Sequence, residues 1–102
     1  MTDRILVVDD DKKIVKMIKD FLEMEQYQVI TAYDGEAAIR QTQQNPDLIL
    51  LDINMPGMNG LEVCRTIRDM LDCPIIFLTA RIEERDKIIG LRTGGDDYIV
   101  KI

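Results

Sequence analysis

The sequence predicts an α/β domain with a doubly wound, five-stranded parallel sheet in the strand order 2-1-3-4-5. Short apolar runs alternate with longer segments whose apolar residues recur at helical spacing, which is the pattern of strands joined by crossover helices. Two of these runs, Leu48 to Leu51 and Ile75 to Leu78, are apolar at every position, as in strands buried on both faces. The 102 residues suffice for one such domain, so we expect residues 1–102 to form a single unit.

The elements are expected in a fixed order along the chain. Strands are predicted at residues 4–8, 28–32, 48–51, 75–78 and 98–102, and helices at residues 12–25, 35–44, 61–71 and 83–93. Asp11 and Asp34 precede the first two helices and are suited to cap them, while Pro46 stops the second. Pro56 to Gly60 is rich in turn residues and separates the third strand from the third helix. Gly94 and Gly95 suit the end of the fourth helix.

Composition excludes several classes of function. There are 19 acidic and 13 basic residues, a net charge of -6, and no cluster of Lys and Arg, which argues against direct nucleic-acid binding. No apolar run approaches the roughly 20 residues of a membrane span, and no signal segment is visible, so we expect a cytoplasmic protein without membrane contact. The chain has no histidine, which rules out His-activated nucleophiles and His-ligated zinc. Cys64 and Cys73 lack metal-ligand spacing and are expected to be reduced thiols.

Polar residues follow the predicted strands at their carboxyl ends. Asp9 and Asp10 follow the first strand, and Asp52 ends the third. Thr79 ends the fourth strand, and Lys101 lies in the fifth. Because the carboxyl ends of parallel strands share one edge, and strands 1 and 3 are neighbours at the switch in strand order, this edge is the expected ligand site.

These residues have the chemistry of phosphoryl transfer. Three crowded carboxylates repel one another unless a cation neutralises them, and oxygen ligands without His or Cys favour Mg2+. The Thr79 hydroxyl and the Lys101 amine could hold a phosphoryl group, and Asp52 is the natural nucleophile, forming an aspartyl phosphate.

Each residue alone also has an ordinary structural explanation. Asp9 to Asp11 could simply cap the first helix, Thr79 could be structural, Lys101 could be a solvated end residue and Asp52 a turn residue. The functional interpretation is favoured because the strand topology brings all of them to one edge.

The combination of motifs resembles the receiver domain of bacterial two-component response regulators. The matching segments are Ile5 to Asp11, Asp47 to Gly60, Leu78 to Ala80 and Asp96 to Lys101. The Gly-Gly-Asp-Asp-Tyr run resembles regulators that carry a winged-helix transcription factor as a second domain, the OmpR/PhoB-like subfamily. The resemblance implies a flavodoxin-like fold and a phosphoryl-accepting switch that takes its phosphoryl group from a sensor histidine kinase and controls an output, expected to be transcription. It implies no enzyme beyond self-catalysed phosphoryl transfer and autodephosphorylation.

The resemblance also implies a role for each site residue. Asp52 is the expected phosphoacceptor. The expected Mg2+ ligands are Asp10 and Asp52 directly, Asp9 through water and the Asn54 backbone carbonyl. Thr79 and Tyr98 are the expected switch pair, with Lys101 as the phosphate-binding amine.

The sequence departs from the family pattern in two places. Ile102 stands where the family usually has Pro, directly after the expected phosphate-binding Lys101. The sequence also stops before the family's fifth helix, so the domain is expected to be truncated at its C-terminal end. One apolar face of the sheet would then lack cover, and we expect this chain alone to be poorly stable or to self-associate, for example as a homodimer.

Two other functions use similar residues. A phosphohydrolase of the haloacid-dehalogenase type also forms an aspartyl phosphate, but it has a second Asp two residues after the nucleophile, where this chain has Asn54. A flavodoxin-like nucleotide binder should have a Gly-, Ser- or Thr-rich first loop, whereas Asp9 to Asp11 would repel phosphate without a metal.

Overall fold

The computed structural model describes the backbone of residues 3–79 and 97–100 and the side chains of residues 3–78. The strands are β1 (Arg4–Val8), β2 (Gln28–Ala32), β3 (Leu48–Asp52), β4 (Ile75–Thr79) and β5 (Asp97–Val100). The helices are α1 (Lys12–Met24), α2 (Gly35–Gln41), the 3-10 helix η1 (Thr42–Gln44) and α3 (Gly60–Met70).

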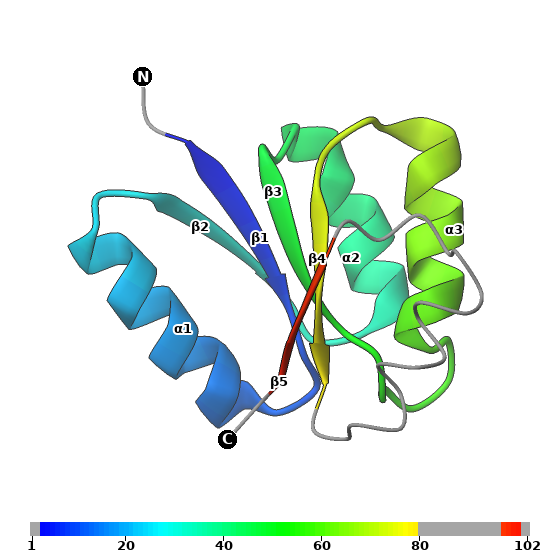
Figure 1. Cartoon of the computed structure of the whole chain (residues 1–102), viewed down its shortest axis with the longest axis horizontal. Helices are drawn as coiled ribbons and strands as arrows, with labels where there is room; N and C mark the ends of the chain where they lie inside the picture. Colours follow the sequence, from blue (N-terminus) through cyan, green and yellow to red (C-terminus); the bar gives the residue numbers. More distant parts are fainter. Residues whose placement is uncertain (1–2, 80–96, 101–102) are drawn as a thin grey trace.

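The strands form one parallel five-stranded sheet in the order β2-β1-β3-β4-β5, as predicted (Figure 1). Val8 of β1 is paired with Leu51 of β3, and Asp52 is paired with Leu78 of β4. The register therefore aligns the carboxyl ends of β1, β3 and β4 along one edge of the sheet.

Helices cover the two faces of the sheet unequally within the described residues. Figure 1 shows α1 on one side of the sheet and α2 with α3 on the other. Leu6 and Val8 of β1 belong to the larger core cluster, with residues of α2 and α3, whereas Ile5 and Val7 pack with Val15 of α1. This alternation along β1 is the two-residue period of a strand buried on both faces.

Aspartates cap the N-termini of the first two helices, as predicted. The Asp11 carboxylate accepts a hydrogen bond from the Lys13 N–H at 2.9 Å, and Asp34 accepts one from the Ala37 N–H at 2.8 Å. Each bond satisfies an N–H that has no partner within its own helix, which typically contributes about 1 kcal/mol.

The second helix is shorter than the sequence predicts. Regular α-helix ends at Gln41, and residues 42–44 form η1. The Thr42 hydroxyl bonds back to the Ile39 carbonyl at 2.5 Å, and Asn45 has a left-handed φ of 54°, which ends the helical path ahead of Pro46.

Other boundaries differ by one residue or lie outside the described part of the chain. The third helix begins at Gly60 rather than Leu61, and β3 includes Asp52. The fifth strand begins at Asp97, one residue before the predicted start. The predicted helix at residues 83–93 and the strand residues 101–102 lie outside the described residues.

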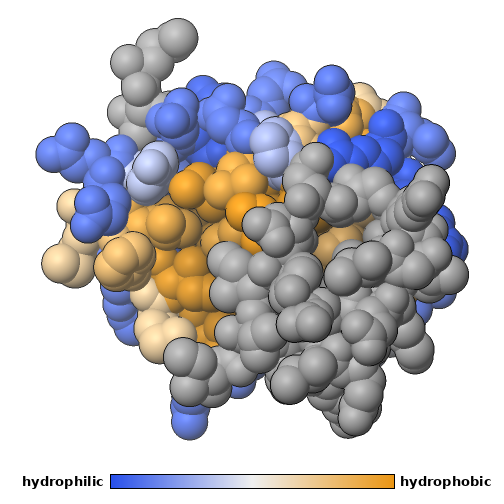
Figure 2. All heavy atoms as spheres, in the orientation of Figure 1, coloured by the Kyte–Doolittle hydropathy of each residue, from blue (hydrophilic) through white to orange (hydrophobic). Residues whose placement is uncertain are grey.

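An apolar groove lies between α1 and the sheet. It has a volume of about 460 Å³ and is lined by Met17, Ile18, Phe21, Leu22, Leu50 and Leu78. Figure 2 shows apolar side chains gathered on this side of the molecule. Met17 and Phe21 are 65% and 62% exposed, so α1 presents large apolar groups to solvent beside the groove.

Among the described helices, none has the length and apolar character needed to cross a membrane.

Candidate functional site

Three carboxylates meet at the carboxyl edge of β1 and β3. Because Val8 is paired with Leu51, the next residues of the two strands, Asp9 and Asp52, emerge side by side. Asp10 follows directly, and one carboxylate oxygen from each of Asp9, Asp10 and Asp52 lies within 4.8 Å of the others. The sheet order and register thus bring these three predicted residues together.

The three acids differ in burial. Asp9 and Asp52 are 0% and 2% exposed, whereas Asp10 is exposed. The Asp9 carboxylate accepts a hydrogen bond from the Asp11 N–H at 2.9 Å, and that of Asp52 accepts one from the Asn54 N–H at 3.4 Å. Buried carboxylates so close together need positive charge or hydrogen-bond donors to offset the loss of hydration.

The donor set fits a small, hard cation. Mg2+ takes oxygen ligands at about 2.1 Å, so two oxygens on the same ion are at most about 4.2 Å apart. One carboxylate oxygen from each of Asp9, Asp10 and Asp52 lies within 4.8 Å of the others, which is close to this spacing. Exposed Asp10 leaves one side open to water, which Mg2+ keeps among its ligands.

The backbone after Asp52 is anchored on both sides. The Ile53 N–H donates to the Leu78 carbonyl of β4 at 3.2 Å, and the Ile53 carbonyl accepts from the Gly60 N–H at 2.9 Å. Met55, 6% exposed, packs into the core, while Asn54 is exposed beside the acids. The turn is thus tied to both β4 and α3.

The remaining predicted site residues are described in part or not at all. Thr79 is the last residue of β4, at the same edge as Asp52. Tyr98 lies in the neighbouring β5, where its backbone is paired with Phe77. Lys101 lies outside the described residues.

Comparison with known proteins identifies the family. The family model described as the response regulator receiver domain matches residues 5–102. The chain belongs to this family. It is also 48% identical, over 99% of its length, to the alkaline phosphatase synthesis transcriptional regulatory protein PhoP of Bacillus subtilis (strain 168). That similarity fits a receiver domain of the winged-helix subfamily. The chain spans 43% of the length of PhoP.

Solved receiver structures share the fold of this receiver domain. The response regulator TrrA of Thermotoga maritima, in complex with Mg2+ and BeF, is 42% identical with a TM-score of 0.88. The alignment covers 99% of this chain and 88% of TrrA. The BeF3-activated N-terminal receiver domain of Klebsiella pneumoniae RstA is 33% identical with a TM-score of 0.88, over 97% of this chain and 86% of RstA.

One residue of the receiver site is missed by sequence reasoning. The sequence pattern places Gly60 only in a turn, yet it begins α3 and its N–H holds the Ile53 carbonyl. The available signal is Asn59, whose side chain accepts from the Glu62 N–H at 3.0 Å as a helix cap. Asn59 and Glu62 have the three-residue spacing of a capping pair, which indicates a helix start at Gly60.

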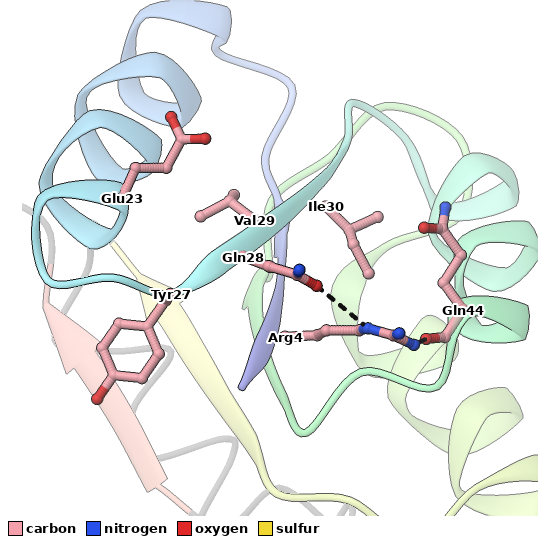
Figure 3. A pocket seen from close by; sticks show the side chains of 7 residues that line it. All are labelled: Arg4, Glu23, Tyr27, Gln28, Val29, Ile30 and Gln44. Carbon is pink, nitrogen blue, oxygen red and sulfur yellow. Dashed lines mark hydrogen bonds between the residues drawn. The ribbon is translucent and has the colours of Figure 1, made fainter. Parts of the chain in front are cut away.

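A second, polar pocket lies at the opposite edge of the receiver sheet. It has a volume of about 500 Å³ and is lined by residues at the amino ends of β1 and β2, the end of α1 and η1, among them Glu23 and Tyr27 (Figure 3). The Arg4 guanidinium donates to the Gln28 side chain at 3.3 Å and to the Gln44 carbonyl at 2.7 Å. These bonds tie β1 to β2 and η1 and account for Arg4 structurally.

Proposed function

We propose that this receiver domain is a phosphoryl-accepting signalling switch in which Asp52 is the phosphoacceptor. The observation that carries the proposal is the meeting of Asp9, Asp10 and Asp52 within 4.8 Å at the carboxyl edge of the sheet. Asp52 is the acid at the end of the central strand β3. A carboxylate at this place is held by the sheet and can attack a phosphoryl group that approaches from the open edge.

The proposed phosphoryl donor is a phosphohistidine of a sensor histidine kinase, because receiver domains of response regulators take phosphoryl groups from such kinases. This chain contains no histidine of its own. An Asp52 carboxylate oxygen forms a bond to phosphorus while the phosphorus–nitrogen bond of the donor breaks. The electron pair of that bond returns to the imidazole, which takes up a proton from water. With a small acyl phosphate as donor, the bond that breaks is a phosphorus–oxygen bond, and its electron pair leaves with the carboxylate. The receiver domain would then catalyse its own phosphorylation without a kinase.

Mg2+ is the proposed cofactor, held by Asp9, Asp10, Asp52 and the Asn54 backbone carbonyl. When bound, the ion offsets the negative charge that the acids and the phosphoryl group share. The similar TrrA is a complex with Mg2+ and BeF, which supports the same assignment here. Asp9 and Asp10 are proposed to hold the ion beside Asp52, and Lys101 is proposed to contact the phosphoryl oxygens.

The output is proposed to be control of transcription in the cytoplasm. The transcriptional output is supported by the similarity to PhoP, which is named a transcriptional regulatory protein. Thr79 and Tyr98 are the proposed switch pair that passes the phosphorylation state to the surface around β5. Residues 1–102 are proposed to act as one receiver unit without binding nucleic acid directly, given their net charge of -6.

Association with a second copy is a further part of the proposal. The groove between α1 and the sheet is apolar throughout its lining, and α1 exposes Met17 and Phe21 beside it. Burying these groups against another copy would remove apolar surface from water. A homodimer through this face is therefore proposed for the 102-residue chain when it is studied by itself.

Phosphorylation of Asp52 is tested with acetyl phosphate and Mg2+. Intact mass spectrometry is expected to show the addition of one phosphoryl group to the wild type and none to Asp52→Asn. Asp69→Asn, which removes an exposed carboxylate of α3, is the matched control and should be labelled like the wild type. Chelation of Mg2+ should suppress labelling. Equal labelling of wild type and Asp52→Asn would refute the assignment of the phosphoacceptor.

The phosphohydrolase alternative gives a different result. An aspartyl-phosphate phosphohydrolase of this type turns over phosphate esters many times with the help of a second Asp. In this chain Asn54 occupies the position of that second Asp. We expect no sustained release of phosphate from p-nitrophenyl phosphate. The similarities to known proteins give this alternative no support.

A further inference from the structure

Gly60 occupies a position with no room for a side chain. A Cβ placed there would lie 2.2 Å from the Asp52 carbonyl oxygen, 2.7 Å from the Ile53 Cα and 2.9 Å from the Asp52 carbonyl carbon. All three neighbours are backbone atoms of the segment that presents the Asp52 carboxylate. Relief of the contact would therefore require movement of this backbone or of the start of α3.

The same residue makes a hydrogen bond to that segment. The Gly60 N–H donates to the Ile53 carbonyl at 2.9 Å, while the Ile53 N–H donates to Leu78 of β4 at 3.2 Å. The peptide groups on both sides of Ile53 are thus fixed, one by β4 and one by α3. Gly60 is a first-turn residue of α3, whose N–H has no partner within its helix, so the bond also satisfies that donor.

We propose that Gly60 is a positioning residue for the phosphoacceptor site. Because it has no side chain, the start of α3 can pack directly against the backbone of Asp52 and Ile53. The inference rests on the proposed function of Asp52 and extends it to a residue that contacts neither phosphate nor Mg2+. A methyl group at Gly60 needs about 1 Å more space to reach an ordinary contact distance, and misplacement by 1 Å can cost on the order of a hundredfold in rate.

Two other glycines near the loop provide matched controls. A Cβ at Gly35 would meet the Val63 side chain at 2.7 Å and the Met58 side chain at 3.1 Å, and no contact with Asp52 is among its nearest ones. Gly57 has a left-handed φ of 78° with no heavy atom within 4 Å of an added Cβ, so its substitution strains the loop without a clash. Alanine substitutions at the three positions therefore have different effects. The one at Gly60 displaces the backbone of Asp52, the one at Gly35 disturbs side-chain packing, and the one at Gly57 strains the backbone.

The experiment compares wild type with Gly60→Ala, Gly35→Ala and Gly57→Ala. Chemical unfolding first gives the stability of each variant, and later measurements use conditions in which each is folded. Mg2+ affinity is then measured by calorimetric titration, and the rate of Asp52 phosphorylation by acetyl phosphate at saturating Mg2+. Gly60→Ala is expected to weaken Mg2+ binding about tenfold or more and to slow phosphorylation by a similar factor. The two controls are expected to lose stability yet stay within about twofold of wild type in both readouts.

The outcomes separate the positioning role from general damage to the loop. A folded Gly60→Ala variant with wild-type Mg2+ affinity and phosphorylation rate would overturn the proposal. So would equal losses in Gly35→Ala or Gly57→Ala, because loop packing alone would then explain them. If wild-type Asp52 takes no phosphoryl group, the proposed function fails, while the Mg2+ comparison still tests the positioning.

A second measurement covers the case in which Gly60→Ala does not fold. In the wild type, Mg2+ should slow amide hydrogen exchange at Gly60 and Ile53, since their hydrogen bonds hold the segment that the ion tightens. Ala37, whose N–H bonds to Asp34 at the start of α2, is the reference amide. Equal effects of Mg2+ on all three amides would overturn the proposal.

Discussion

Asp9 and Asp10 are consecutive carboxylates with different surroundings. Asp9 is 0% exposed and accepts a hydrogen bond from the Asp11 N–H, so one of its oxygens already has a donor. Asp10 is exposed at the open side of the cluster. A metal ion that enters from solvent therefore meets Asp10 first, and Asp10 has more freedom to adjust to it.

Replacement of Asp10 by Ala is expected to weaken Mg2+ binding about tenfold or more, because it removes a proposed direct oxygen ligand and one negative charge. Asp9→Ala should weaken binding less, since a contact through water is easier to replace. Calorimetric titration of both variants at the same ionic strength gives the ranking.

Asp20→Ala is the charge-matched control for this pair. Asp20 is exposed on α1 and bonds to Lys16 at 2.9 Å, a hydrogen bond that raises the pKa of the Lys16 amine. Its loss changes the net charge equally but removes no oxygen from the acidic cluster, so Mg2+ affinity should stay near wild type. A stronger effect of Asp9→Ala than of Asp10→Ala would contradict the proposed roles.

At the scale of elements, β4 and β5 are the proposed route from the site to the surface. Thr79 ends β4 beside the site, and the backbone of Tyr98 is paired with Phe77 two residues earlier. The two residues therefore lie on adjacent strands, close to the same edge. A phosphoryl group at Asp52 that draws the Thr79 hydroxyl inward would change the space beside β5.

Thr79→Val is expected to leave Asp52 able to accept a phosphoryl group but to decouple Tyr98 from it, because valine keeps the shape and lacks the hydroxyl. The measurement is the NMR spectrum of the Tyr98 ring before and after addition of Mg2+ and beryllofluoride. Tyr98 shifts as large as those of wild type would show that the Thr79 hydroxyl is not needed.

Regular elements could be predicted where sequence pattern and tertiary structure agree. Asp11 and Asp34 stand directly before helical patterns, and the all-apolar runs Leu48 to Leu51 and Ile75 to Leu78 predict the buried parts of β3 and β4. The start of α3 is harder to predict, because Gly60 follows strong turn residues and glycine is a poor helix former. Only the spacing of Asn59 and Glu62 indicates a helix start there. The close approach of α3 to Asp52, a tertiary contact, selects glycine there despite its low helix propensity.

The acidic cluster could be predicted because strand order alone aligns the ends of β1 and β3. Local sequence could not give the unequal burial of Asp9 and Asp10, which depends on how the loop after β1 turns. It also could not give the anchoring of Ile53 by Leu78 and Gly60, because both bonds depend on the packing of separate elements. Asp52 could thus be located from the chain pattern, whereas the support of its backbone required the fold.

At the scale of the whole molecule, the two faces of the sheet have different cover among the described residues. α2 and α3 enclose the larger core cluster, while α1 borders the apolar groove. The 102-residue chain by itself is expected to self-associate through the groove or to unfold at low temperature for a domain of its size. Light scattering over a concentration series, with thermal unfolding in parallel, measures both.

Phe21→Ser tests whether the groove is the surface involved. It removes a 62% exposed aromatic group from α1 and should lower the apparent molar mass at a given concentration. Met70→Ser removes a 54% exposed group from the end of α3 and serves as the control, with no expected change. Equal effects of the two substitutions would point to nonspecific association. A monomeric wild type with an ordinary melting temperature would contradict the prediction.

The position of β1 between β2 and β3 has a consequence for synthesis on the ribosome. β1 can pair with β2 once about the first third of the chain has emerged, but Asp9 meets Asp52 only after β3 has followed. The bond from Ile53 to Leu78 must wait for β4. During its early folding, a nascent chain therefore has only two of the three acids of the cluster, Asp9 and Asp10, at the carboxyl edge of the sheet. The third charge arrives together with β3, whose apolar residues build the core that holds the repelling acids in place.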